Sequence, residues 1–512
     1  MAGKRQATHS RNDSEKLLSD RLATIDARLA QIDAQFAKDF PEYASLASVK
    51  PASVAEVQAQ LRDDEALVLF LDTDERFKRA PEESFIWVIT KTNMSWVRSN
   101  LGTNALAREV AALRCGLDDT LWNIAESADK CIALVKKYRS DANLDGRFVQ
   151  VLPFDLERAH GLYKALLEPV VAIIKDKHLF IVPSGALTQL PFQVLVTANP
   201  DPALGGAEAF RHAAWLVRSH ALTVLPSVSS LRALRQLAKE SHASRTLIGF
   251  GNPLLDGPNT RYDQWASEAR SKSCAKVREQ RVAALTVENR SVVPLKVRGG
   301  LVDVADVRVQ VPLPETADEL CAVARDLGVG SEEIRLGERA TEAEIKRLSA
   351  EGELSKYRMI HFATHGALAG QIGEGSEPGL LLTPPNTATE TDDGYLSASE
   401  IAALKLDADW VILSACNTAA GGVEGAEAMS GLARAFFYAG ARALLVSHWS
   451  VYSDATVKLI TGAVRRMAAD KSVGRVQAMR QSMLAMIDTG KPLEAHPAFW
   501  APFVVVGEGA AR

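Results

Sequence analysis

The feature that most constrains this chain is a pair of short apolar runs that each stop at a reactive side chain. The first run, 357–363, leads to His365, and the second run, 410–413, leads to Cys416. A short apolar run that is closed by turn formers is typical of a buried strand in a parallel sheet. Ligands of open α/β sheets bind just beyond the carboxyl ends of such strands. We therefore expect His365 and Cys416 to lie side by side, as the base and the nucleophile of one site.

Short apolar runs alternate with amphipathic stretches from about residue 60 to the end of the chain. This alternation predicts an α/β fold with a mostly parallel sheet that is flanked by helices. Two runs, 85–90 and 94–98, are separated by a three-residue turn and should pair as a hairpin. Ser397 and Glu400 have the spacing of a capping box, which predicts that a helix begins at this point.

Breaks in this rhythm suggest four parts of the chain. Residues 1–50 start with a polar, disorder-prone segment and continue as an amphipathic helix over 14–36, which could dock a partner or pack on its own domain. Residues 51–255 and 313–512 are two α/β portions, which could be two duplicated sheets or one continuous sheet. Residues 256–312 interrupt the alternation as an insertion or linker, with a hairpin expected in 291–311.

Composition narrows the classes of function. A formal net charge of -4 gives no electrostatic footprint for nucleic acid. The five cysteines are scattered and odd in number, which argues against a disulfide framework or a metal site and for a reducing compartment. The start of the chain has no apolar core of a signal peptide, and no run is long enough to span a bilayer. We therefore expect a cytoplasmic protein with no membrane partner. Dinucleotide and P-loop motifs are absent, so no cofactor is expected.

The expected site supplies the groups that acyl transfer needs. A thiol becomes a good nucleophile as thiolate, and a neighbouring imidazole can take its proton and return it to the leaving amine. The backbone N–H groups of Gly366 and Cys416 are candidate donors to the oxyanion. His361 lies within the strand and is expected to pack in the core. Cys115, Cys131 and Cys321 fall in helix-like segments and are expected to be packing residues.

These residues resemble the motifs of the CHAT domain family, a caspase-like group related to separase, caspases and metacaspases. The resemblance rests on motifs spread over the second half of the chain, at 361–366, 394–401, 413–418, 425–436 and 440–451. The upstream stretch 179–195 also resembles the family. The resemblance to this family implies a caspase-like fold with an N-terminal pseudo-caspase-like portion. It also implies an endopeptidase that uses Cys416 and His365. The chain departs from the commonest family architecture because no tetratricopeptide repeats precede the domain.

The resemblance also suggests a protein substrate and a regulatory protein or assembly as activator, in bacterial signalling, antiviral defence or cell death. The strand after the nucleophile's helix would pair with an extended substrate along Ser447, His448 and Trp449. Trp449 could equally be a core residue. An acidic pocket would select Arg or Lys, and its candidate carboxylates are Asp392, Asp393, Glu424, Glu427 and Asp454.

Two other functions stay open from the sequence. The chain could be a catalytically inactive caspase-like scaffold or a peptide-binding module, although both reactive residues are present. An acyl hydrolase or transferase could use the same dyad, but the chain has no nucleophile-elbow motif.

Overall fold

The computed structural model describes a defined part of the chain, which comprises residues 21–22, 24–25, 27–28, 31, 52–74, 81–122, 125–135, 152–237, 241–276, 295–298, 300–367, 377–414, 427–449 and 452–509. The chain divides into two compact units, Met1–Ala52 and Ser53–Arg512. In the first unit the described residues between 21 and 31 are helical, and they fall within the helix predicted over 14–36.

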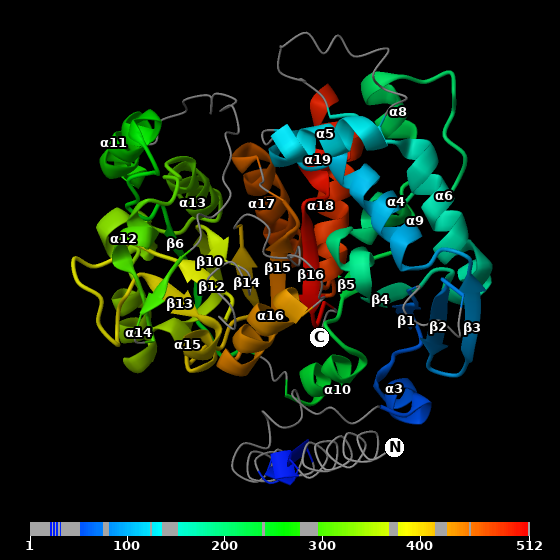
Figure 1. Ribbon diagram of the computed structural model, residues 1–512, viewed down its shortest axis with the longest axis horizontal. Coiled ribbons are helices and arrows are strands. Elements are labelled where there is room, and N and C mark those ends of the chain that lie inside the picture. The colour runs from blue at the N-terminus through cyan, green and yellow to red at the C-terminus, as the bar shows by residue number, and fades with distance from the viewer. Residues whose placement is uncertain are drawn as a thin grey trace, which may run out of the picture. The chain divides into compact units, whose positions relative to one another are not determined.

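The second unit is built on one continuous sheet of eleven strands (Figure 1). The strands, in their spatial order, are β3 (Met94–Ser99), β2 (Ser84–Thr90), β1 (Glu65–Asp72), β4 (His178–Val182), β5 (Leu222–Val224), β16 (Phe503–Gly507), β15 (Ala443–Ser447), β14 (Trp410–Leu413), β10 (Tyr357–Ala363), β6 (Arg245–Gly251) and β9 (Ile334–Leu336). The predicted α/β fold with a mostly parallel sheet is confirmed.

Most of the sheet consists of two parallel halves that run in opposite directions, and β2 and β3 extend the first half as the predicted antiparallel hairpin. Strands β1, β4, β5 and β16 are parallel to one another, and so are β15, β14, β10, β6 and β9. The halves meet where β15 pairs antiparallel with β16. The last strand of the chain thus completes the first half, and β6, from the 51–255 portion, lies between β10 and β9. Of the two arrangements left open by the sequence, one shared sheet is the observed one.

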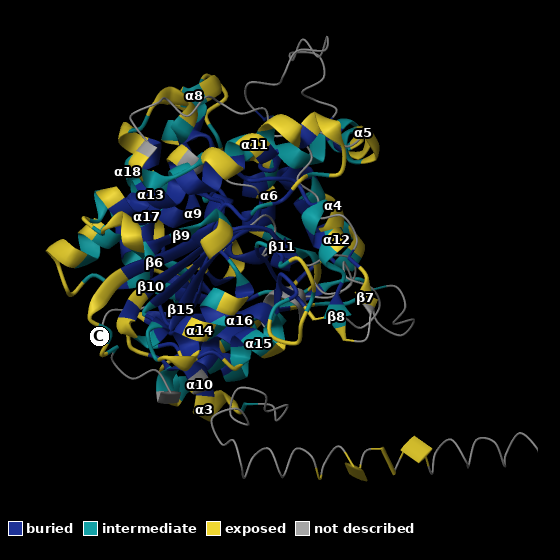
Figure 2. Ribbon diagram, turned by 90° about the vertical axis from the view of Figure 1, so that its left-hand side faces the viewer, coloured by how far each residue is buried: buried dark blue, intermediate teal, exposed yellow. Residues whose placement is uncertain are grey.

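Helices cover both faces of the sheet, and the strands between them are buried (Figure 2). Their bounds are α3 (Val54–Gln60), α4 (Thr103–Cys115), α5 (Ala125–Leu134), α6 (Leu156–Leu166), α7 (Val171–Ile174), α8 (Gly206–His212), α9 (Leu216–Ser219), α10 (Val228–Leu237), α11 (Asp263–Ser271), α12 (Val304–Arg308), α13 (Glu315–Asp326), α14 (Glu342–Ala350), α15 (Ala398–Ala402), α16 (Glu427–Ala439), α17 (Ser453–Ala469), α18 (Arg475–Thr489) and α19 (Pro497–Trp500).

Alternation along β10 decides which helices meet which side chains. Phe362 contacts Phe436 of α16 on one face, with ring centroids 5.7 Å apart. Met359 and His361 point to the other face, where α13 and α17 pack on the sheet. Side chains of a strand point alternately to its two faces, so alternate residues of each strand pack against different helical layers.

Two shorter sheets complete the second unit. Strands β11 (Gly366–Ala367), β12 (Gly379–Leu381) and β13 (Tyr395–Ser397) form an antiparallel sheet directly after His365. The hairpin expected in 291–311 is shorter than predicted, with β7 (Val297–Arg298) paired to β8 (Leu301–Val302). The predicted capping box at Ser397 and Glu400 is confirmed at the start of α15.

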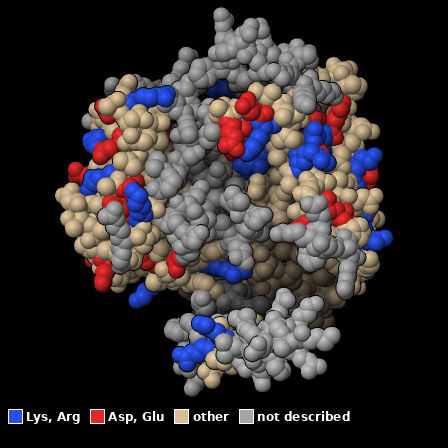
Figure 3. Space-filling view, viewed as in Figure 1, with Lys and Arg blue, Asp and Glu red and all other residues tan. Residues whose placement is uncertain are grey.

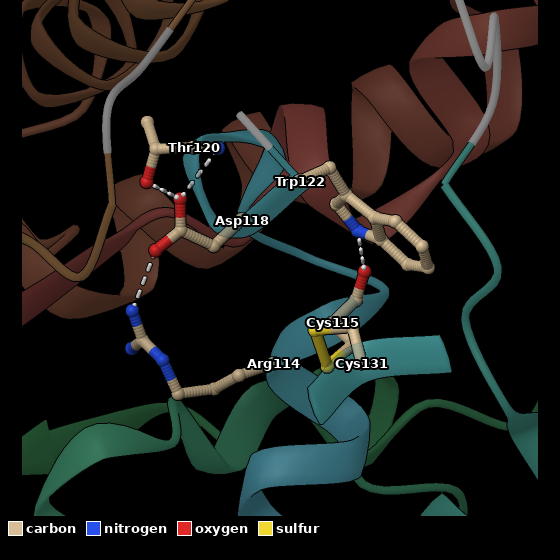
Figure 4. Close-up of a disulfide and its surroundings, with 6 residues drawn as sticks. All are labelled: Arg114, Cys115, Asp118, Thr120, Trp122 and Cys131. Atoms are coloured by element: carbon tan, nitrogen blue, oxygen red, sulfur yellow. Dashed lines mark hydrogen bonds and ion pairs between the residues drawn. A yellow bond between two sulfur atoms is a disulfide. The ribbon is translucent and has the colours of Figure 1, made fainter. Parts of the chain in front are cut away.

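Four of the five cysteines are paired, so the prediction of unpaired packing cysteines is wrong. Cys115 at the end of α4 is bonded to Cys131 of α5 (Figure 4), and Cys274 is bonded to Cys321 of α13. These pairs are 16 and 47 residues apart in the sequence, and spacing alone does not show that folding brings them together. The argument from cysteines for a reducing compartment therefore does not hold.

The surface carries both signs of charge. On the face shown in Figure 3, Lys and Arg side chains are interspersed with Asp and Glu side chains. Of the helices within the described ranges, none is both long and apolar enough to cross a membrane.

Candidate functional site

The strands that lead to the two reactive residues are neighbours in the sheet. β10 pairs in parallel with β14, and Phe362 lies opposite Leu413. The Ser414 N–H donates to the Phe362 carbonyl at 3.0 Å, so both strands end at the same edge. The structure therefore brings His365 and Ser414 to one end of the sheet. Cys416 lies outside the described residues, as does Glu424.

His365 follows β10 and is held in a defined orientation. Its Nε2 lies 2.7 Å from the Val311 carbonyl oxygen, and the residue is 1% exposed. Because a carbonyl can only accept, Nε2 must carry the proton of this bond. In a neutral imidazole the lone pair is then on Nδ1, which makes Nδ1 the basic atom.

The backbone N–H of Gly366 points away from the small sheet that contains β11. Gly366 lies opposite Leu380, and the Leu381 N–H donates to the His365 carbonyl at 2.9 Å. This pattern identifies Gly366 and Leu380 as a pair that does not exchange hydrogen bonds. The Gly366 N–H therefore points to the outer side of β11, which is an edge strand of the small sheet. This N–H is therefore not used in the pairing of β11 with β12.

His361 belongs to a buried polar cluster that links three elements. Its Nε2 lies 2.9 Å from the Ser414 hydroxyl and 3.1 Å from Glu319 Oε1 of α13. The Ser414 hydroxyl donates to the same Glu319 oxygen at 2.6 Å. His361 is 0% exposed, and among the described residues its Nδ1 has no hydrogen-bond partner. The cluster fixes the start of the segment that carries Cys416.

The segment predicted to bind substrate lies in the interior as far as it is described. Ser447 pairs with Phe503 of β16, and the His448 N–H donates to the Pro502 carbonyl at 2.9 Å. β15 is thus an internal strand, and on its β16 side both residues already pair with the backbone. The side chain of Trp449 is 1% exposed and its Nε1–H donates to Ala498, so this indole packs in the core.

Burial also controls the charge of His448. Burial lowers the pKa of its imidazole to about 3, and the nearby Arg114 guanidinium acts in the same direction. Arg114 donates to the His448 carbonyl at 3.3 Å and forms an ion pair with Asp118 at 2.7 Å (Figure 4). The Cys115–Cys131 disulfide adjoins this ion pair in sequence and, with it, braces α4 at this end of β15.

The acidic candidates are spread over different environments. Asp454 is exposed near the start of α17. Asp393 is buried and accepts from the backbone N–H groups of Val302 and Tyr395, so its carboxylate holds β8 against β13. It lines a cavity of about 450 Å³ together with several other carboxylates, namely Glu342, Glu377, Glu390 and Glu400. Asp392 is half-buried, and the side chain of Glu427 lies outside the described residues.

Lys346 neutralises part of the negative charge at this cavity. Its ammonium group forms ion pairs with Glu342 and with Glu400. Burial raises the pKa of the Glu342 carboxyl group. Burial acts in the same direction on Glu400, but the hydrogen bonds from Lys346 and Ser397 outweigh it and lower the pKa of that carboxyl group. These carboxylates thus organise the junction of α14 and α15 in the structure.

Two contributors to the site were not found from the sequence. The Val311 carbonyl comes from the region read as an insertion or linker, and a backbone group has no sequence signature. Glu319 looks like an ordinary polar residue of an amphipathic helix, and only the packing of α13 on the sheet brings it to His361. Among the residues that the structure describes, no group of three or more His, Cys, Asp or Glu side chains is placed to hold a metal ion.

Comparison with known proteins gives a family and more distant likenesses. The CHAT domain model matches residues 156–508. Tetratricopeptide repeat protein 28 of Mus musculus is 27% identical over 227 aligned residues, and the match covers 38% of this chain and 9% of that protein. The chain thus aligns with less than a tenth of that relative.

Two solved structures of the Saccharomyces cerevisiae separase–securin complex, at 3.0 and 2.6 Å resolution, also resemble the chain. Their sequence identities are 8% and 10%, and each has a TM-score of 0.39. The matches cover 88% and 91% of this chain and 30% and 33% of those chains.

Proposed function

The chain belongs to the CHAT domain family, and on this premise we propose that it is a cysteine endopeptidase that cleaves a protein partner. Cys416 is the nucleophile and His365 is the general base. The observation that carries the proposal is the hydrogen bond from His365 Nε2 to the Val311 carbonyl. It leaves Nδ1 as the basic atom of a histidine that follows the strand next to the one leading to Cys416.

The reaction proceeds in two stages. His365 Nδ1 takes the thiol proton of Cys416, and the thiolate attacks the carbonyl carbon of the scissile peptide bond. The N–H groups of Gly366 and Cys416 donate to the resulting oxyanion. The C–N bond then breaks, and His365 gives its proton to the leaving amine. In the second stage, water activated by His365 hydrolyses the thioester and restores the thiol.

Activity is regulated by a partner or by assembly. The 1% exposure of His365 supports this part of the proposal, because a substrate carbonyl must reach the base and the nucleophile together. The setting is a cytoplasmic signalling, defence or cell-death pathway. An inactive scaffold that binds a peptide is the alternative, and the burial of His365 is the observation that favours it.

A peptide library tests the proposal. Wild type and Cys416→Ala are incubated with the library, alone and with extract of the source cells as a supply of activator, and cleavage is read by mass spectrometry. We expect cleavage by wild type with one dominant residue at P1, and none by Cys416→Ala. Cleavage that survives Cys416→Ala contradicts the mechanism. Saturable peptide binding without cleavage in either condition supports the scaffold.

A further inference from the structure

A second cavity lies at the opposite end of the sheet from His365. Its volume is about 530 Å³, and it is lined by the amino-terminal residues of β6, β10 and β14 and by the junction of α17 with α18. β10 runs from Met359 at this cavity to Ala363 at the other end, a rise of about 13 Å, and His365 follows two residues later. The cavity shares no lining residue with the candidate active site.

The walls of this cavity are rich in cations. Four basic side chains and one carboxylate line it, namely Arg358, Arg442, Lys471, Arg475 and Asp409. Asp409 is shared, since it forms ion pairs with both Arg358 and Arg475 at 2.7 Å. Arg442 forms its ion pair with Asp407 behind the wall, and Lys471 is exposed. The lining residues therefore carry an excess of positive charge.

Burial makes the positive charge of Arg475 less favourable unless an anion lies nearby. It lowers the pKa of the Arg475 guanidinium, and the positive charge of Arg442 acts in the same direction. Asp409 and Glu508 act on Arg475 in the opposite direction, but Asp409 is shared with Arg358, so a further anion near these guanidinium groups would be favourable. Arginine forks and exposed lysines are the side chains that bind phosphate oxygens in proteins.

The first turn of α18 also faces this cavity. The helix begins at Arg475 after Gly474, which provides no side-chain cap, and its first turn contains no acidic residue. Both residues line the cavity. In this turn the Val476 N–H donates to the Gly509 carbonyl at 2.9 Å. The dipole of a helix of this length still favours an anion at its N-terminus.

A buried hydrogen-bond donor without an acceptor lies at this cavity, and it belongs to Trp410. Its indole lines the cavity and is 2% exposed. Its buried Nε1–H has no hydrogen-bond partner among the described residues. A buried donor without an acceptor is unfavourable, so an oxygen atom that reaches it is stabilised.

We propose that this cavity binds a small phosphate-bearing molecule. The phosphate group is held by Arg475, Lys471 and the N-terminus of α18, and the Trp410 N–H donates to an oxygen of the ligand. The organic part packs on the apolar walls formed by Met359, Val464 and Met467. The volume is in the range of small-molecule sites in proteins. The proposal concerns binding and stands independently of the peptidase activity.

Titration calorimetry with phenyl phosphate and with inorganic phosphate on the full chain tests this site. We expect saturable binding of both, tighter for phenyl phosphate because its ring packs on the apolar walls. Lys471→Gln should weaken binding by about 3- to 5-fold through loss of one exposed charge. Trp410→Phe should weaken it by about 10-fold through loss of a donor to a charged group.

Lys164→Gln, which removes an exposed lysine on α6, is the matched control and should bind as wild type does. Circular dichroism verifies folding, and if Trp410→Phe does not fold, Lys471→Gln carries the test. The proposal is overturned if wild type shows no more heat than in sodium chloride of equal ionic strength. It is equally overturned if Lys471→Gln and Lys164→Gln bind alike.

Discussion

The two histidines of the β10 segment use the same ring atom for different purposes. His361 Nε2 lies against the hydroxyl of Ser414, which follows β14, and the carboxylate of Glu319 in α13. His365 Nε2 lies against the backbone carbonyl of Val311. The first arrangement ties elements together, and the second orients a ring whose other nitrogen can exchange a proton. This difference supports the choice of His365 as the base, which stays a prediction.

Trp449 gives a residue-scale prediction. We expect Trp449→Phe to lower the free energy of unfolding by about 1 kcal/mol, because the Nε1 hydrogen bond to Ala498 is lost while most of the buried ring area is kept. The cleavage profile at P1 should not change. Denaturant unfolding and the peptide library measure the two quantities. A changed P1 profile at unaltered stability would show that this indole contacts the substrate.

The elements around the site show what a sequence can and cannot predict. The apolar runs of the sequence predict the strands at the core of the sheet. Ser397 and Glu400 predict the capping box at the start of α15. Helix α18 was not predicted. Its buried side chains include Met, Ala and Ser, and it packs beside α17, where Ser482 donates to the Leu459 carbonyl. A helix covered on several sides lacks the single apolar stripe that reveals an amphipathic helix.

The link between α13, β10 and β14 gives an element-scale prediction. Glu319→Ala removes the acceptor of the Ser414 hydroxyl and of the His361 ring. We expect the free energy of unfolding to fall by about 2 kcal/mol, because the His361–Ser414 hydrogen bond remains but one buried donor is left without an acceptor. Peptide cleavage should fall as well, since Ser414 begins the segment that carries Cys416.

Glu332→Ala is the control for that variant. Glu332 is exposed just before β9, and its replacement should change stability by less than about 0.5 kcal/mol. Chemical unfolding of the three proteins makes the comparison. If Glu319→Ala is as stable as Glu332→Ala, the buried cluster does not hold these elements together.

At the scale of the whole molecule, the order of the strands is the feature that the sequence left most open. The alternation of elements predicts the fold class, but it does not show that β16 joins the first half of the sheet or that β6 joins the second. Both placements depend on contacts between residues that are hundreds of positions apart. The sequence does not show the two disulfides either, since each depends on which segments folding brings together.

Buried neutral histidines make the stability of the whole molecule depend on pH. Burial lowers the pKa of His448 to about 3 and that of His496 to about 4. His496 accepts from the Ala498 N–H through Nδ1, and its Nε2 lies 3.0 Å from the Leu152 carbonyl oxygen, so its neutral form is the bonded form. Below pH 6.5 the unfolded chain binds protons that the folded chain does not, and stability falls as the pH falls.

We expect each of these two histidines to remove roughly 2 kcal/mol of stability between pH 6.5 and pH 5. Unfolding by denaturant across this range measures the slope. His496→Gln should show a shallower slope than wild type, whereas His212→Gln, at an exposed histidine, should not. Equal slopes in all three proteins would contradict the assignment.

The most direct test of the dyad is the pH dependence of thiol alkylation. Of the five cysteines, four are paired in the two disulfides, so Cys416 is the single cysteine left to react. The rate of its reaction with iodoacetamide reports the fraction of thiolate. A base that takes the proton shifts the midpoint of this profile below the ordinary thiol pKa of about 8.5.

We expect a midpoint well below about 8.5 in wild type and a return towards that value in His365→Gln. His361→Gln, the matched variant of the neighbouring histidine, should keep the low midpoint. A His365→Gln profile that is identical to wild type, or a return to the ordinary value in His361→Gln instead, would contradict the assignment of His365 as the base of Cys416.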